Sequence, residues 1–240
     1  MKAPQAPQAR VAAYDWSGFY IGANAGYAWG SSNVATSVSS SGAYFVTTDP
    51  AQIAAAGQAS LHPSGGTGGI QAGYNWQVGQ LLYGLEVDFD AFGLNASRIV
   101  TTGYLTAPGT TFTVNQSVKT DWLFTSRGRL GWASNNWLLY MTGGLAITKI
   151  RYDNTFTDTF SPALENGSTS KAKTGWVLGG GLEYGLARNW SIKAEYLYMD
   201  FGSLSSSGAV SNTGAVPPAV LVHSTNLTAE TARAGVNYRF

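Results

Sequence analysis

Eight stretches of the chain alternate between apolar residues and polar or small residues with a period of two. In the last stretch, Thr231–Phe240, one face carries Ala, Val, Tyr and Phe, and the other carries Arg233 and Arg239. A period of two predicts a β-strand with one apolar face. The eight predicted strands are Phe19–Trp29, Thr67–Val78, Leu81–Phe92, Lys119–Ala133, Trp137–Ile150, Lys171–Leu186, Trp190–Phe201 and Thr231–Phe240.

The connections between these stretches are long and short in strict alternation. Long segments, expected to be loops, follow the first, third, fifth and seventh strands, at about 30–66, 93–118, 151–170 and 202–225. Short turns lie at 79–80, 134–136 and 187–189. This asymmetry is typical of outer-membrane barrels with short periplasmic turns and long extracellular loops. The sequence therefore predicts an all-β fold, a closed eight-stranded antiparallel barrel over 16–240 after a flexible lead-in over 1–15.

Composition favours a membrane barrel over a soluble domain. Only 11% of the 240 residues are charged and 13% are aromatic, against about 25% charged in ordinary soluble domains. No apolar run approaches the ~18 residues of a membrane-spanning helix. The net charge of +1 gives no reason to expect nucleic acid, and the absence of cysteine excludes disulfides and thiolate metal sites. We expect no cofactor and no metal.

Tryptophan lies near both ends of the predicted strands. Amphipathic rings gather at the headgroup level of a membrane, whereas a soluble barrel could carry them merely as strand-end markers. The predicted interface aromatics are Trp16, Trp76, Trp132, Trp137, Trp190, Tyr238 and Phe240 at the short-turn end, and Trp29, Trp122 and Trp176 at the long-loop end.

Charged residues of the strands fall on the face opposite the apolar one, which is the lumen of a membrane barrel. An eight-stranded barrel is just wide enough for side chains to fill it, so we expect a structural plug of ion pairs, with a narrow ion path as the alternative. A catalytic carboxylate pair is disfavoured, because nearby cations hold carboxyl pKa values low. The predicted network is Glu86, Asp88, Asp90, Arg127, Arg129, Glu183, Lys193, Glu195, Arg233 and Arg239.

Basic residues also gather at the loop ends of three neighbouring strands. Lipopolysaccharide carries phosphates at that height, which a fixed basic patch could bind through charge-assisted hydrogen bonds. The alternative is a set of solvated charges at the base of the loops. The candidate contacts are Lys119, Lys149, Arg151, Lys171 and Lys173.

Other candidate chemistry is sparse. His62 and His223 fall in predicted loops without a neighbouring catalytic set, and an enzyme would rest on fold analogy alone. The glycine runs at 68–69 and 179–181 lack the Lys-Ser/Thr of a phosphate loop, so they are expected to make room for lumen side chains. No catalytic residue is predicted.

Seven segments together resemble the small outer-membrane immunogenic proteins, also called porin-family or OmpA-like barrels. This resemblance implies an exported, integral protein of the Gram-negative outer membrane, inserted by the barrel-assembly machinery that recognises a C-terminal strand ending in Phe. The N-terminus has no apolar signal region, so the signal is expected to be removed or to lie upstream. The segments are YDWSGFYIGANAGYAWG at 14–30, GGIQAGYNWQ at 68–77, YGLEVDF at 83–89, SRGRLGWA at 126–133, GWVLGGGLEYGL at 175–186, WSIKAEYLYMDFG at 190–202 and ARAGVNYRF at 232–240.

The sequence thus favours a monomeric outer-membrane barrel that supports the envelope and displays four loops. A low-conductance pore for small solutes is the first alternative. A soluble ligand-binding barrel of the lipocalin type is the second.

Overall fold

Ten β-strands and one helix make up residues 14–240, the part of the chain that the computed structural model describes. Residues 1–13 of the predicted lead-in lie outside the described residues, whereas Tyr14 is buried against Trp16 and belongs to the packed structure. The elements are β1 (Gly18–Ser40), α1 (Asp49–Gly57), β2 (Ala59–Leu61), β3 (Ser64–Val78), β4 (Leu81–Phe92), β5 (Asn95–Gly103), β6 (Thr111–Ser134), β7 (Trp137–Asp158), β8 (Leu164–Ala187), β9 (Trp190–Ala209) and β10 (Val220–Arg239).

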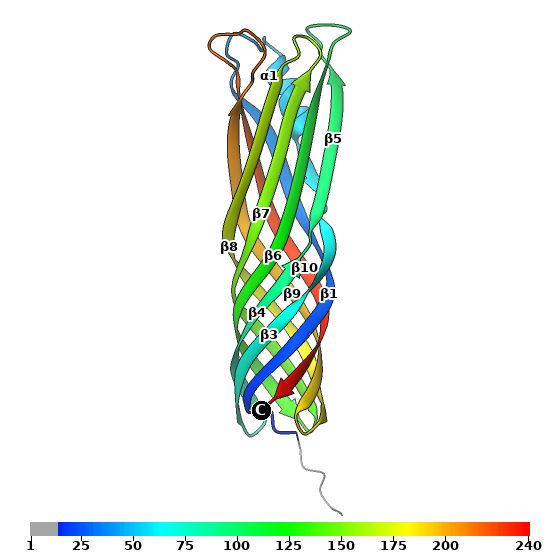
Figure 1. The fold of residues 1–240 in the computed structure, drawn as a ribbon, viewed down its shortest axis with the longest axis vertical. Coiled ribbons are helices and arrows are strands. Elements are labelled where there is room, and N and C mark those ends of the chain that lie inside the picture. Colours follow the sequence, from blue (N-terminus) through cyan, green and yellow to red (C-terminus); the bar gives the residue numbers. More distant parts are fainter. Residues whose placement is uncertain (1–13) are drawn as a thin grey trace, which may run out of the picture.

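Eight antiparallel strands close into a ring, as the sequence predicts (Figure 1). The order is β1-β10-β9-β8-β7-β6-β4-β3, and β3 pairs with β1 to complete it. Two-residue turns join β3 to β4, β6 to β7 and β8 to β9, and Gly79 and Asn135 supply positive φ angles of 61° and 52° in two of them. No helix among residues 14–240 is long and apolar enough to cross a bilayer.

In the lower section, near the short turns, apolar side chains point outward and polar ones inward. Strand β4 alternates without a break: Leu85 and Phe89 are exposed on the outside, and Glu86, Asp88 and Asp90 are buried in the lumen. Exposed leucine and phenylalanine on every second residue suit a wall that faces hydrocarbon.

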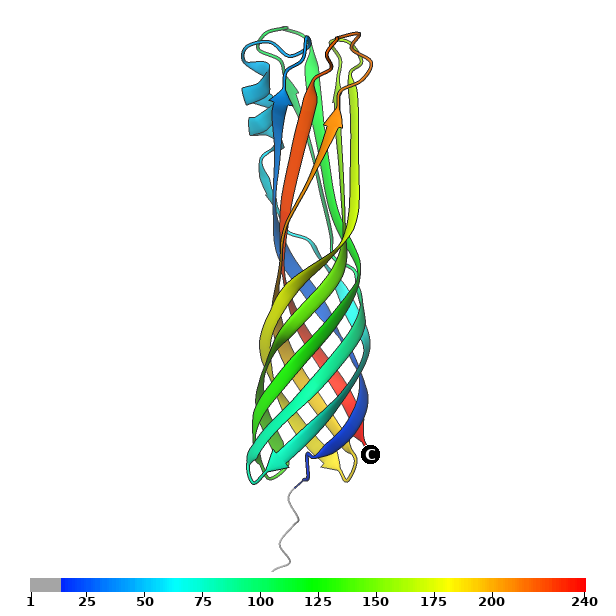
Figure 2. The same cartoon turned by 90° about the vertical axis from the view of Figure 1, so that its left-hand side faces the viewer.

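The prediction of four long loops is wrong for most of their residues. Strands β1, β7 and β9 continue well beyond their predicted ends, and β6, β8 and β10 begin well before their predicted starts. Figure 2 shows these extensions as a steep upper section above the tilted strands of the lower one. The connections left at the tip are short, at 41–48, 104–110, 159–163 and 210–219.

The extensions escape prediction because their polarity is reversed. In upper β6, Phe112, Val114 and Val118 point into the barrel, while the outward positions between them are Thr, Asn and Ser. In upper β7, Tyr152 and Phe156 are buried in the same way. Hydrophobic side chains face inward when the outside is water, so this section has the surface of a soluble protein.

Bulges mark the level of the reversal. Between Thr120 and Leu123, β6 contains one residue more than the facing stretch of β7. Because of this bulge, the buried positions are odd-numbered below it, from 123 to 133, and even-numbered above it, from 112 to 120. On β9 the register with β10 shifts opposite Asn226 and Thr228, next to Gly202 with φ of 66°. Each bulge re-aims the side chains of the strand that continues above it.

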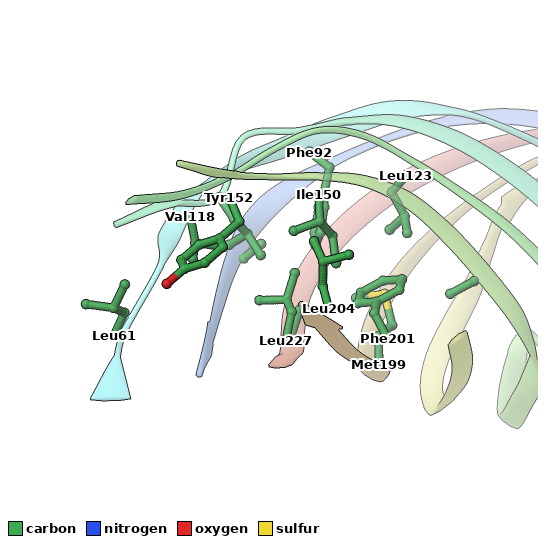
Figure 3. Packing of buried hydrophobic residues seen from close by; sticks show 14 of the residues in the cluster. Leu61, Phe92, Val118, Leu123, Ile150, Tyr152, Met199, Phe201, Leu204 and Leu227 are labelled. Atoms are coloured by element: carbon green, nitrogen blue, oxygen red, sulfur yellow. The ribbon is translucent and has the colours of Figure 1, made fainter. Parts of the chain in front are cut away.

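Above the bulges the ring becomes two four-stranded sheets, β5-β6-β7-β8 and β2-β1-β10-β9. The β8–β9 ladder ends at Trp176 and Asp200, and a single bridge between Leu164 and Ser211 rejoins the strands at the tip. Helix α1 packs against β1 at the other seam. The sheets enclose an apolar core, of which Figure 3 shows the lower cluster, including Phe92, Leu123 and Phe201.

A cation on the outer wall should distinguish the two sections. Met141 on β7 is 66% exposed and lies between the aromatic levels, so Met141→Lys should cost about 2–4 kcal/mol of folding free energy in lipid vesicles. Thr155→Lys, on the water-facing extension of the same strand, should change it by less than about 0.5 kcal/mol. Urea titration followed by tryptophan fluorescence measures both. Equal costs would show that the two sections share one environment.

Candidate functional site

A network of nine buried charges fills the lumen of the lower section. Their charged side chains are at most 4% exposed, and they come from β4, β6, β8, β9 and β10. Nine of the ten predicted residues therefore meet in one place. They are Glu86, Asp88, Asp90, Glu183, Glu195, Arg127, Arg129, Lys193 and Arg233.

Arg127 lies at the centre of this network. Its Nη2 is 2.7 Å from Asp88 and also bonds Glu86, and its Nη1 is 3.0 Å from Glu195. The guanidinium thus joins two carboxylates of β4 to one of β9 across the lumen. A planar, five-donor group suits this role, because a lysine could not contact three carboxylates in fixed directions.

Arg233 makes a second crossing. Its Nη1 is 2.9 Å from Asp90, its Nη2 is 2.7 Å from Asp88, and it also bonds Glu195. Asp88 and Glu195 are therefore shared by Arg127 and Arg233, and each charge has several partners. Shared, hydrogen-bonded pairing is what allows charges to persist away from water.

Neutral donors offset the one carboxylate in excess of the four cations. Tyr20 donates to Glu86 at 2.7 Å, Tyr140 to Glu195 at 2.9 Å, and Asn237 to Glu183 at 2.7 Å. Inward-facing glycines leave space for both phenols, because a Cβ on Gly73 or Gly181 would lie within 2.5 Å of the Tyr20 or Tyr140 hydroxyl oxygen. These donors are absent from the predicted network, although their inward-facing positions on the strands mark them.

Arg239 does not belong to the network, contrary to the prediction. Its Nη1 donates to the Ser17 carbonyl at 2.9 Å and lies 3.6 Å from Asp15, and its guanidinium lies 5.3 Å from the centre of the Tyr14 ring. The predicted inward direction of Arg239 is right, but its depth is wrong. At the short-turn rim the lumen is filled by Tyr14 and Trp16, so the Arg239 side chain stays at the edge.

Apolar layers close the lumen above the network. Phe92, Leu123, Leu197 and Met199 form part of a first buried cluster. A second cluster near the tip includes Phe45, Ile53, Phe112 and Phe156. The interior therefore holds buried ion pairs in its lower part and packed apolar side chains above them.

His223 is not in a loop, as the sequence suggested, but on β10 and fully buried. Its Nδ1 is 2.9 Å from the Thr36 hydroxyl and its Nε2 is 3.3 Å from Glu165. Hydroxyl, imidazole and carboxylate are in an order used by hydrolases. All three residues are at most 2% exposed, so the hydroxyl is closed to a substrate. Their polar groups instead pair with one another inside the core. His62 is exposed beside β2.

Among residues 14–240, no cluster of three or more His, Cys, Asp or Glu could hold a metal ion.

The predicted interface aromatics are mostly outward, with one exception. Trp29, Trp76, Trp132, Trp137, Trp176, Trp190 and Phe240 are exposed on the wall, Trp122 is partly exposed and stacks on Phe89, and Tyr238 packs between Trp190 and Phe240. Trp16 is only 2% exposed and packs inside the short-turn end, so its assignment to the interface is wrong. It precedes β1, where strand parity no longer fixes the side-chain direction.

The five basic candidates start from two different faces. Lys119 on β6 lies directly opposite Arg151 on β7 in the strand register. Both of these residues and Lys149 lie on the outer face. Lys171 and Lys173 pair with the inward-facing Ile150 and Thr148, and they reach the surface because β8 and β9 have parted. Lys173 donates across this seam to the Ser203 carbonyl at 2.7 Å. A single five-residue patch is therefore not present.

A closed ring of eight strands, an apolar wall between two aromatic levels and an ion-paired lumen define a transmembrane β-barrel of the outer-membrane class. The chain belongs to the outer membrane protein beta-barrel domain family, whose model matches residues 3–240. It is therefore an integral protein of the Gram-negative outer membrane, which excludes the soluble lipocalin-type alternative.

Relatives of the chain carry outer-membrane names. It is 36% identical to the 31 kDa outer-membrane immunogenic protein of Brucella melitensis, over 99% of this chain and 89% of the relative. It is 31% identical to a 22 kDa outer membrane protein of Rhizobium leguminosarum, over 59% of this chain and 56% of that one. The solved outer membrane protein OprG of Pseudomonas aeruginosa aligns with 93% of this chain and 97% of its own, at 14% identity and a TM-score of 0.46.

Removing the central cation should destabilise the barrel strongly. Arg127→Met removes the one cation of residues 14–240 that contacts Glu86, Asp88 and Glu195 together, and breaking a buried pair costs about 3–5 kcal/mol. Arg188→Met, at an exposed periplasmic turn, is the matched control and should cost less than about 0.5 kcal/mol. Urea unfolding in vesicles gives both values, and a small loss for Arg127→Met would contradict the central position of this residue.

Proposed function

We propose that this protein is a monomeric, sealed barrel that strengthens the outer membrane and carries a rigid, closed surface projection. The observation that supports it best is the filling of the interior along its length. The ion-paired network, the lower apolar cluster and the tip cluster lie one above another, and each consists of buried side chains. A solute would have to displace all three.

The extension supports the surface part of the proposal. Short connections at the tip and paired strands below them give a stiff projection rather than four mobile loops. Such a projection presents a fixed outer face of Ser, Thr and Asn side chains to the surroundings.

Planar-bilayer recording tests the seal. The refolded chain should insert without producing discrete conductance steps, because an ion would have to pass three layers of buried side chains. Altered gel mobility without boiling verifies that the inserted protein is folded, and a large porin serves as the positive control. Reproducible discrete openings from the folded chain would contradict the proposal and favour a low-conductance pore.

We further propose that Lys119, Lys149 and Arg151 contact phosphates of lipopolysaccharide. These three residues lie on the outer face, immediately above the level of Trp122 and Trp176. Phosphates bind fixed cations best where several converge, and the Lys119–Arg151 cross-strand pair places two of them side by side.

Charge neutralisation tests this contact. The triple variant Lys119→Gln, Lys149→Gln, Arg151→Gln should co-purify with several-fold less lipopolysaccharide than the parent. A double variant, Lys171→Gln with Lys173→Gln, removes two charges from the other face and should retain the parental amount. Equal retention by all three proteins would refute the contact.

Insertion by the barrel-assembly machinery is also proposed, with β10 as the segment recognised. Strand β10 pairs with β1 to close the ring, and the Phe240 ring packs on Phe19 and Tyr238 at the outer wall. Deleting Phe240 removes no lumen contact. It should lower the amount of protein in the outer membrane several-fold, while the purified variant refolds with parental stability. Unchanged membrane levels would count against recognition through Phe240.

A further inference from the structure

A small pocket opens at the extracellular tip, well away from the lumen network. It has a volume of about 110 Å³ and is formed where the 41–48 segment, the start of α1, the 104–107 turn and Phe160 meet. Four aromatic rings contribute to its wall: Tyr44, Phe45, Tyr104 and Phe160. Tyr44 lies 5.1 Å from Phe45 and 6.2 Å from Phe160 between ring centres. The rings therefore surround a space much smaller than the roughly 300–1,000 Å³ of a drug-sized site.

Two buried carboxylates accompany these rings. Asp49 lines the pocket and is 5% exposed, and Asp158, 8% exposed, accepts hydrogen bonds from the hydroxyls of Tyr44 and Tyr104 at 2.6 and 3.0 Å. Among residues 14–240, neither carboxylate has a cationic side chain within 4.0 Å. The pocket thus combines aromatic faces with uncompensated negative charge.

The phenols stay neutral and leave this negative charge in place. Burial, and then the hydrogen bond to Asp158, raises the pKa of Tyr44 to about 12, and burial and the Asp158 charge raise the pKa of Tyr104 further still. Both hydroxyls therefore remain donors to Asp158, and neither phenol adds a negative charge of its own.

The surroundings add to the field. Neither α1 nor any of the four tip connections contains lysine or arginine. The nearest basic residues along these strands are Arg98 and Arg151, below the tip. A cation is therefore attracted to the tip, and no resident side chain competes for the pocket.

Hydrogen-bond satisfaction decides which cation fits. Both Asp49 oxygens already accept protein hydrogen bonds, from the Val46 N–H at 3.0 Å and the Thr106 hydroxyl at 2.7 Å. Asp158 accepts from the Ser161 N–H as well as from the two phenols. A metal ion or primary ammonium would have to bind these oxygens directly and compete with the hydrogen bonds that they already accept. A quaternary ammonium has no N–H to satisfy and needs only aromatic faces and negative potential.

We propose that this pocket binds a quaternary trimethylammonium group. Free choline and the phosphocholine head group of a lipid share this chemistry. The ligand sits among the four rings, and Asp49 and Asp158 supply the negative potential without direct bonds to it.

Calorimetric titration of the refolded chain in maltoside detergent tests the proposal. Choline should bind saturably, and its uncharged isostere 3,3-dimethyl-1-butanol should bind at least about tenfold more weakly, because it lacks the charge that the rings recognise. A second titration with phosphorylcholine separates the sources: tighter binding than choline identifies the lipid head group, and weaker binding identifies the free cation. Equal binding of choline and its isostere, or no saturable binding of choline, would overturn the proposal.

Variants locate the site. Phe160→Ala removes an exposed wall residue and Asp49→Asn removes one charge, and each should weaken choline binding by about tenfold. Leu105→Ala alters a neighbouring residue that is 75% exposed and does not line the pocket, so it should bind like the parent. Gel mobility without boiling verifies folding of each variant. Parental affinity in both pocket variants would also overturn the proposal.

Discussion

The same strands must satisfy two solvents, and the rest of the structure follows from this constraint. In the lower section the wall faces hydrocarbon, so the apolar half of each alternating pattern points outward. In the upper section the wall faces water, so the apolar half points inward. Strands such as β6 and β7 cross the boundary without interruption, and a bulge near Thr120 absorbs the change of face on β6.

The nature of the interior follows from the wall. Below the boundary the inward residues are polar, and only mutual pairing makes their burial tolerable. Arg127 and Arg233 therefore tie four strands together through Asp88 and Glu195. Above the boundary the inward residues are apolar and form an ordinary core, so two four-stranded sheets can enclose it without the full ring of hydrogen bonds.

The lower section is predicted well from the sequence, because a period of two with aromatic residues at the strand ends is typical of membrane-spanning β-strands. Glu86, Asp88 and Asp90 occupy the lumen as their parity requires. The extensions were mistaken for loops because Ser, Thr and Asn on the outer face resemble loop composition, and a bulge hides the continuing alternation of Phe112 and Val114. The alternation gives the direction of a side chain but not its depth in the barrel, so it places Arg239 wrongly in the network. It also gives no direction before a strand begins, so it places Trp16 wrongly at the interface.

Long-range packing accounts for what sequence could not supply. Thr36, Glu165 and His223 lie far apart in the sequence, and only the register of β1 with β10 brings Thr36 to His223. The tip pocket likewise combines Tyr44, Tyr104 and Phe160 from three separate connections. Single residues of these types carry no signal until the strands fix their neighbours.

The reversal of wall polarity is most directly tested by spin-label accessibility along β6. The chain has no cysteine, so single cysteines can be placed from 111 to 134 without background labelling, leaving Arg127 and Arg129 of the lumen network in place. In lipid vesicles, even-numbered labels from 124 to 132 should collide with oxygen dissolved in the hydrocarbon. Odd-numbered labels from 111 to 119 should collide instead with a water-soluble nickel reagent. Inward-facing labels, at even positions from 112 to 118 and at 125, 131 and 133, should collide with neither. A loss of alternation between positions 111 and 119, or exposure of the same parity on both sides of position 120, would contradict the account.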